Sequence, residues 1–288
     1  MLPEPVRRLA EEIASDTRSG ALPLAQKALE AYSLLGQLSG NETSARELHG
    51  LLRMAQPWMA AVVNAAQMGW ELARSARWGG LPGLKERLAD ARQLVAREAI
   101  GILTECKTVV TVSYSSDVFE ALRRRQETGS AFEVYVCESR PLNEGVALAR
   151  DLKDVGVRAT LVVDAAGPSL VARSDAVITG VDSLLREGSL INKIGTMSLA
   201  LTCSEFSVPF YPIMEVLKVE VEGHEISPVE KSRDPGEVSE DLEALNFYFE
   251  RVPSRLATSL VTDAGILKVS SLLNRFRRPE DLLSFYLP

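Results

Sequence analysis

The residues with the clearest chemical potential follow the fourth of five predicted strands. Gly180-Val181-Asp182 ends this strand, and Asn192, Lys193 and Gly195-Thr196 come next, ahead of a predicted helix at 197–204. A carboxylate, a nearby cation and the N–H groups of a helix start can together hold a phosphorylated polar ligand. The other interpretation is a structural Asp–Lys pair beside a capped helix. The motif is neither a Walker A loop nor a GxGxxG pattern, which disfavours an ATPase and an ordinary NAD enzyme.

Polar residues also follow the first two predicted strands. Residues 113–117, which begin with Ser113, lie ahead of a predicted helix at 118–125, where hydroxyls can cap the helix or hold a phosphate. No histidine lies near them in the sequence, so a serine hydrolase triad has little support. Arg140 follows the second strand and suits bidentate recognition of an anion, although a salt bridge with Glu138 or Glu144 is an equal alternative.

Short apolar runs rich in β-branched residues must position these side chains. They predict strands at 107–114, 132–139, 158–164, 175–182 and 208–214, with helical patterns such as 118–129 and 144–156 between them. Such alternation indicates a parallel sheet that helices cover on both faces. In open parallel sheets ligands bind outside the carboxyl ends of the strands, which is where the polar residues lie.

The first hundred residues carry helical periodicity and no strand signal. Apolar spacing predicts helices across 24–38, 42–55, 57–76 and 81–106. We expect Ser44 to cap the second of these helices and Pro57 to lie in the first turn of the third. The pattern divides the chain into a helical domain, residues 1–106, and an α/β domain, residues 107–288. Residues 222–243 are polar and are typical of a long surface loop.

Composition disfavours several classes of function. The 288-residue chain is 46% apolar and 25% charged, as in globular proteins, and its net charge of −7 disfavours direct binding to nucleic acid. No apolar run reaches the roughly 18 residues of a membrane span, and the N-terminus lacks the apolar region of a signal peptide. Cys106, Cys137 and Cys203 are far apart, which favours reduced thiols in a cytoplasmic protein. With only His49 and His224 as histidines, we expect no metal site, and we expect no cofactor.

The motifs at the strand ends resemble those of one protein family. It contains the regulatory subunits of initiation factor two-B, methylthioribose-1-phosphate isomerase and archaeal ribose-1,5-bisphosphate isomerase. The matching segments run in order along nearly the whole chain: 19–21, 57–60 with Asn64, 138–141, 180–182, 192–196, 208–211, 233–235 and 252–267. The Asn-Lys-Ile-Gly-Thr element at 192–196, which follows Gly-x-Asp, is quite specific.

This resemblance implies a helical N-terminal domain, a Rossmann-like parallel-sheet C-terminal domain and a homodimer formed largely through the latter. It also implies a phosphosugar pocket between the domains. In the isomerases, a cysteine after the first strand and the Asp of Gly-x-Asp, here Asp182, convert an aldose 1-phosphate into a ketose 1-phosphate without metal or nucleotide cofactor. The implied ligand-binding residues are Ser19, Gly20, Ala21, Ser113, Arg140, Asp182, Asn192 and Lys193.

Three residues depart from the isomerase pattern. Ser113 stands at the cysteine position, and a serine hydroxyl holds its proton far more tightly than a thiol does. Gln56 stands where an arginine is common and Glu144 where a glutamine is common, so the pocket has one cation fewer and one anion more. We therefore expect a non-isomerising, regulatory protein that binds a phosphorylated sugar or nucleotide. The alternative is an aldose–ketose sugar-1-phosphate isomerase that uses Asp182, so enzymatic activity stays open.

The expected partners are the phosphorylated ligand and a second copy of the chain. The apolar segments 208–214 and 282–288 would offer hydrophobic surface for a homodimer. We expect no contact with a membrane. A pure interaction protein within a translation complex is a third interpretation, and it requires partner surfaces that one sequence does not reveal.

Overall fold

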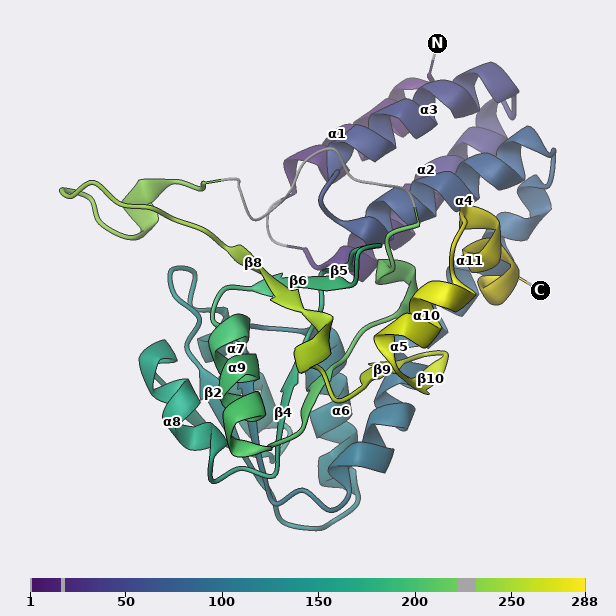
Figure 1. The fold of residues 1–288 in the computed structure, drawn as a ribbon. Helices are drawn as coiled ribbons and strands as arrows, with labels where there is room; N and C mark the ends of the chain where they lie inside the picture. Colours follow the sequence, from purple (N-terminus) through teal and green to yellow (C-terminus); the bar gives the residue numbers. More distant parts are fainter. Residues whose placement is uncertain (1, 17–18, 222–231, 288) are drawn as a thin grey trace. The chain divides into compact units, whose positions relative to one another are not determined.

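The computed structural model describes residues 2–16, 19–221 and 232–287 (Figure 1). The chain forms two compact units. The first comprises Met1–Ala91, Val216–Ile226 and Leu273–Pro288, and the second comprises Arg92–Glu215 and Ser227–Leu272. The division into a helical domain, residues 1–106, and an α/β domain, residues 107–288, stays a prediction.

Helices build the described part of the first unit. They are α1 (Glu4–Ser15), α2 (Ala21–Leu38), α3 (Glu42–Ala55), α4 (Ala60–Arg74), the first half of α5 (Leu81–Leu103) and α11 (Pro279–Tyr286), with 3-10 turns at Trp78–Gly80 and Val216–Lys218. Helix α4 is buried on nearly every side, which explains its continuous small and apolar sequence. The helical prediction for the N-terminal region is confirmed.

Two local predictions in this unit are wrong. Asn41, not Ser44, caps α3, because its side chain accepts a hydrogen bond from the Ser44 N–H at 2.8 Å. Pro57 lies in the turn before α4, which begins at Ala60. The first error changes the capping residue of α3 and the second shifts the start of α4 by a few residues, and helix ends are where sequence patterns are least reliable.

The second unit contains the predicted parallel sheet. Its strands, in the order β3-β2-β1-β4-β7, are β1 (Thr108–Val112), β2 (Glu133–Cys137), β3 (Arg158–Val162), β4 (Ala176–Thr179) and β7 (Phe210–Pro212). Val112 pairs with Cys137, and Cys137 pairs with Val162. The carboxyl ends of three neighbouring strands therefore lie at one level, and the five-strand prediction is confirmed.

Helices cover both faces of this sheet (Figure 1). The second half of α5, α6 (Ser116–Glu127) and α7 (Glu144–Asp154) pack on one face through a core that includes Val95, Val118 and Leu148. Helices α8 (Gly167–Val171) and α9 (Thr196–Phe206) lie together on the other face. This arrangement confirms the mixed α/β fold class.

The buried Arg125 joins α5 to the sheet layer. Its guanidinium donates hydrogen bonds to Leu103 O at 2.8 Å and Thr104 O at 3.0 Å, at the end of α5. The same group lies over the Phe132 ring, 5.0 Å from its centre. A buried cation thus satisfies helix-end carbonyls that have no partner within the helix.

Several short elements were not predicted. β5 (Ser183–Leu184), β6 (Ser189–Lys193) and β8 (Phe249–Pro253) form an antiparallel sheet of their own, and β9 (Leu260–Thr262) with β10 (Gly265–Leu267) forms a hairpin before α10 (Val269–Arg275). Two- to five-residue strands carry too little periodicity to be recognised. Of the predicted loop, residues 222–231 lie outside the described residues. Residues 232–243 contain one 3-10 turn, Pro235–Glu237.

The apolar segments expected to lie at a dimer surface are largely buried instead. Phe210, Ile213 and Met214 are fully buried in the second unit, and Leu282 and Tyr286 are buried in the first. The premise of that prediction is wrong, because these side chains fill the cores of their own units. Among the described residues, no helix has both the length and the apolar character needed to cross a membrane.

Candidate functional site

Hydrogen bonds link the carboxyl ends of β1, β2 and the strand beside them. The Ser113 N–H donates to Ser139 Oγ at 2.6 Å. The N–H groups of Ser139 and Arg140 donate to the two oxygens of Asp164 at 2.7 and 2.8 Å. Sequence reasoning missed Ser139 and Asp164. The rule that singled out Asp182 could have found Asp164, because it also ends a predicted strand.

Ser113 and Ser139 share an uncommon backbone conformation. Their φ angles are +65° and +66°, in the left-handed region that non-glycine residues seldom occupy. Such residues cluster at functional sites, where the surrounding structure holds them. In the described part of the chain, the Ser113 hydroxyl has no hydrogen-bond partner. No neighbouring group there activates it as a nucleophile.

Cys137 does not replace the missing thiol. Its side chain is 2% exposed at the end of β2, beside the buried α8 residue Gly167. Burial raises the pKa of the Cys137 thiol to about 12. A thiol that stays protonated inside the core is a structural group.

Lys193 ends strand β6 in a largely enclosed position. Its Nζ lies 2.5 Å from Glu144 Oε1, and the two side chains are 8% and 26% exposed. The Tyr248 and Phe249 rings lie 4.8 and 5.2 Å from the same Nζ. The other oxygen, Glu144 Oε2, is buried and has no hydrogen-bond partner within the described residues. A carboxylate that the family pattern does not contain therefore binds the cation expected to hold a phosphate.

The Asn-Lys-Ile-Gly-Thr element forms the tight turn from β6 into α9. Asn192 Nδ2 donates to Thr196 Oγ1 at 2.9 Å, and Thr196 Oγ1 donates to Lys193 O at 2.7 Å. Gly195 precedes α9 with φ +100°, which favours glycine. The specificity of this motif thus has a structural cause in addition to any role in binding.

A protein carboxylate already occupies the start of α9. Glu250, on β8, accepts a hydrogen bond from the Met197 N–H at 2.8 Å. Burial raises the pKa of the Glu250 carboxyl, against the lowering effect of the N–H groups of Met197, Gly195 and Thr196. The helix-start donors expected to face a ligand phosphate therefore face Glu250.

Asp182 lies at the junction of β4 and the small sheet. It is half-buried, and its N–H donates to Ile191 O at 2.9 Å. Two residues earlier, a Cβ added to Gly180 would lie 2.6 Å from Ser115 Cβ and 3.8 Å from Asn192 Oδ1. The end of β4, the cap of α6 and the end of β6 thus lie close together.

Arg140 lies at the edge of this cluster. Its side chain is exposed, and its Nη2 donates a long hydrogen bond of 3.5 Å to Glu237 O. Across the residues the structure describes, Arg140 forms no ion pair with Glu138 or Glu144, so that alternative is wrong.

Ser19, Gly20 and Ala21 belong to the first unit. Ser19 donates from its N–H and hydroxyl to the Asp16 carboxylate at 2.8 and 2.7 Å, and Gly20 immediately precedes α2. Gln56, at the position of the family arginine, is buried and donates to Ile13 O and Asp16 O at 2.8 and 2.9 Å. Its amide thus satisfies carbonyl groups at the end of α1.

Comparison with known proteins identifies the family. The model of the Initiation factor 2 subunit family matches residues 55–269. The chain belongs to this family.

Relatives in this family carry different names. An eIF-2B subunit 2-like translation initiation factor of Pyrococcus furiosus is 29% identical, over 93% of this chain and 98% of that protein. A methylthioribose-1-phosphate isomerase of Desulforudis audaxviator is 31% identical, over 77% of this chain and 73% of the enzyme. The crystal structure of the Pyrococcus horikoshii OT3 translation initiation factor eIF-2B has a TM-score of 0.79 at 27% identity, over 93% of this chain and 98% of that one. Membership therefore does not select between a factor and an isomerase.

Proposed function

We propose that this protein binds a phosphorylated sugar or nucleotide at the strand-end site and does not isomerise it, acting as a regulatory member of its family. The observation that carries the proposal is Ser113. It stands where the resemblance implies a catalytic cysteine, and its hydroxyl has no activating partner among the described residues. An unactivated hydroxyl is a poor proton donor and a poor nucleophile.

The charges around Lys193 support weak binding of a ligand phosphate, because another anion competes for the same cation. Lys193 is the most enclosed cation of the predicted site, with 8% of its side chain exposed, and Glu144 already pairs with it. A ligand phosphate must compete with the Glu144 carboxylate for this cation, and Glu250 excludes it from the start of α9. Ligand affinity should therefore respond to changes at Glu144 as well as at Lys193.

Calorimetry with ribose, methylthioribose and hexose phosphates and with nucleotides tests binding. For the tightest ligand, Lys193→Ala removes a charge-assisted contact, and affinity should fall about ten- to hundredfold. Asp182→Asn should leave affinity nearly unchanged. Arg97→Ala is the matched control, because this cation on α5 is 67% exposed and lies outside the site. Equal and small effects of all three changes would contradict the proposed site.

A turnover assay on the same ligands separates the two functions. We expect no isomerisation by the parent protein and none by Asp182→Asn. Turnover that is present in the parent and lost in Asp182→Asn would establish the isomerase alternative in place of the regulatory function.

The proposal includes a homodimer. The family resemblance supports it, although the segments first expected to form its surface are buried. Sedimentation of the purified protein at micromolar concentration should give a species of twice the 31.4 kDa chain mass. A species of single-chain mass would contradict the dimer and leave the ligand proposal standing.

A further inference from the structure

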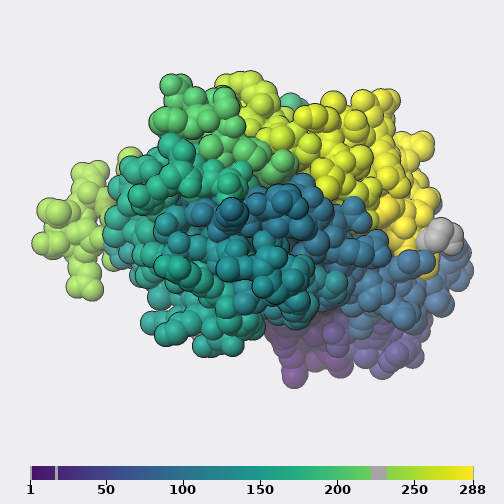
Figure 2. Space-filling view, turned by 90° about the horizontal axis from the view of Figure 1, so that it is seen from below, coloured from purple at the N-terminus to yellow at the C-terminus, as the bar shows by residue number. Residues whose placement is uncertain are grey.

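A hollow on the surface of the second unit lies between the second half of α5 and the end of α6. It is here called the α5–α6 hollow, and it is lined by Arg97, Ile100, Arg124, Glu127 and Thr128. Figure 2 shows the blue segment that contains both helices at the surface of the molecule. The hollow has a volume of about 330 Å³, at the small end of the range for ligand pockets, so its size suits a small molecule.

The α5–α6 hollow is separate from the strand-end site. Helix α6 begins at Ser116, just after the carboxyl end of β1, and ends at Glu127, so the two sites lie at opposite ends of this helix. Ser115, which caps α6, and Arg124 are about 14 Å apart along the helix axis, at about 1.5 Å per residue. A small molecule in the hollow therefore does not touch the residues proposed to hold the phosphorylated ligand.

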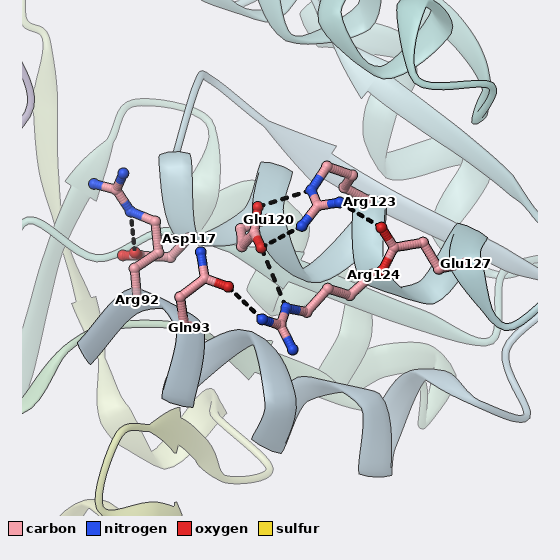
Figure 3. A network of polar contacts seen from close by, with 7 residues as sticks. All are labelled: Arg92, Gln93, Asp117, Glu120, Arg123, Arg124 and Glu127. Atoms are coloured by element: carbon pink, nitrogen blue, oxygen red, sulfur yellow. Dashed lines mark hydrogen bonds and ion pairs between the residues drawn. The ribbon is translucent and has the colours of Figure 1, made fainter. Parts of the chain in front are cut away.

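The Arg124 side chain is held in a fixed direction beside the hollow. Its Nε donates to Glu120 Oε1 at 3.2 Å, and its Nη2 donates to Gln93 Oε1 on α5 (Figure 3). Its Nη1 has no hydrogen-bond partner among the described residues. The guanidinium thus keeps donors available while its orientation is fixed. A group that is ordered in advance loses less entropy when a ligand binds.

Glu127 is held in a similar way, one turn further along α6. Arg123 binds its Oε1, and the Glu127 side chain remains 60% exposed. Its Oε2 has no partner in the part of the chain that the structure describes. One oxygen of a positioned carboxylate is therefore available to accept a hydrogen bond from a ligand.

Arg97 supplies the second cation of the hollow. Its side chain is 67% exposed, and its ion pair with Glu98 is long, at 3.6 Å. Two guanidinium groups that line one hollow repel each other, and an anion bound between them removes that repulsion. The anions that suit arginine donors best are carboxylates and phosphates.

The other lining residues select between these two anions. Two guanidinium groups and the Glu127 carboxylate give the lining one net positive charge. Glu127 repels a phosphate dianion and favours a ligand that carries an ammonium group beside a carboxylate. The half-buried Ile100 side chain offers an apolar contact. A carboxylate, an ammonium group and an apolar side chain occur together in one class of small molecule, the free α-amino acids.

We propose that the α5–α6 hollow binds a free α-amino acid with an apolar side chain. Arg97 and Arg124 hold the carboxylate of the amino acid. Glu127 Oε2 accepts a hydrogen bond from its ammonium group, and Ile100 contacts its side chain. Because the hollow is open to solvent, the dissociation constant is on the order of 1 mM.

The methyl NMR signal of Ile100, assigned with Ile100→Leu, tests this site in the full chain. L-Leucine should shift the signal saturably. Two analogues isolate the charged groups, because isocaproate is leucine without its ammonium group and isopentylamine is leucine without its carboxylate. Each analogue should bind at least about tenfold more weakly than L-leucine, because each lacks one charge-assisted contact.

Two variants separate the roles of the charged residues. Arg97→Ala should weaken binding of L-leucine and of isocaproate alike, about tenfold, because both carry the carboxylate. Glu127→Gln should weaken binding of L-leucine alone and so abolish its preference over isocaproate. Arg150→Ala is the matched control, because this cation is exposed on α7 outside the hollow. Unchanged signals of the other isoleucines establish that each variant is folded.

Three outcomes would overturn the proposal. No saturable shift with L-leucine, L-methionine or L-phenylalanine would mean that the hollow binds no apolar amino acid. Equal affinity of the parent protein for L-leucine and isocaproate would mean that the ammonium group is not recognised. An equal response to inorganic phosphate would mean that the two arginines form a general anion site. Calorimetry with the phosphorylated ligand is independent of these results, because Lys193→Ala and Arg97→Ala act on different sites.

Discussion

Two polar networks in the second unit differ in how completely they are paired. Between α5 and α6, Arg123 donates to both oxygens of Glu120 at 2.9 and 2.7 Å and also binds Glu127 (Figure 3). Arg124 donates to Glu120 at 3.2 Å and to Gln93. Both Glu120 oxygens accept hydrogen bonds, so the Glu120 part of this network is closed.

The strand-end network is open by comparison. Lys193 binds one oxygen of Glu144, and the other oxygen is buried without a partner in the described part of the chain. The Ser113 hydroxyl is likewise unpaired there. A buried polar atom without a partner, such as Glu144 Oε2, destabilises a fold, so it indicates a place where a ligand can supply the missing hydrogen bond.

Removing the enclosed cation should have the largest effect. Lys193→Met leaves the Glu144 carboxylate without its counter-charge, and the free energy of unfolding should fall by about 2–4 kcal/mol. Lys193→Met/Glu144→Gln should regain most of that loss, because both charges are then absent. Urea unfolding of the two variants measures the difference. Equal stabilities of the single and double variants would mean that the pair is solvent-screened.

Removing the charge of the competing carboxylate should strengthen binding of the phosphorylated ligand. Glu144→Gln removes the anion that a ligand phosphate must displace from Lys193, so affinity should rise about tenfold. Glu127→Gln on α6 is the matched control and should leave affinity for this ligand unchanged. Calorimetry with the tightest phosphorylated ligand checks both, and unchanged or weaker binding in Glu144→Gln would contradict competition at Lys193.

The stability that the Glu120 network contributes should depend on pH and not on the ligand. Hydrogen bonding to Arg123 lowers the pKa of Glu120 below its ordinary value of 4.5. The stability that this group contributes is therefore present above pH 4.5 and is lost as the pH falls through the lowered pKa. Glu120→Gln should cost about 1 kcal/mol at pH 7, and the difference from the parent should vanish in acid. Thermal unfolding across pH 3–7, roughly the range in which carboxylates titrate, measures it, and a constant difference would refute the ion-pair account.

An exposed pair beside this network should have the smallest effect. Arg97 lies 3.6 Å from Glu98, and its side chain is 67% exposed. Surface pairs of this kind contribute about 0–1 kcal/mol, so Arg97→Ala should change the unfolding free energy by less than about 0.5 kcal/mol. A larger loss in urea unfolding would show that an exposed ion pair can contribute substantially to the stability of this unit.

Local pattern explains why most of the fold could be predicted. β-branched runs such as 107–114 and helical spacing in 81–106 are properties of neighbouring residues, and both formed the expected elements. The small sheet of β5, β6 and β8 was missed because β6 pairs with β8 across more than fifty residues. Local periodicity in the sequence does not indicate which remote strands pair. The cap of α3 was assigned to Ser44 because several nearby polar residues can cap the same helix, and Pro57 was assigned to the first turn of α4 because proline is also common in the turn that precedes a helix.

The sequence by itself determined the helical N-terminal region, the parallel sheet and the family, because periodicity and the order of motifs are properties of the amino-acid sequence. Only the tertiary structure decided which charges meet. It paired Lys193 with Glu144, which are 49 positions apart, and it brought Glu250 to the start of α9. It also buried the apolar segment that contains Phe210 and exposed Leu242. Burial and ion pairing depend on distances between residues that are remote in sequence, and folding alone sets those distances.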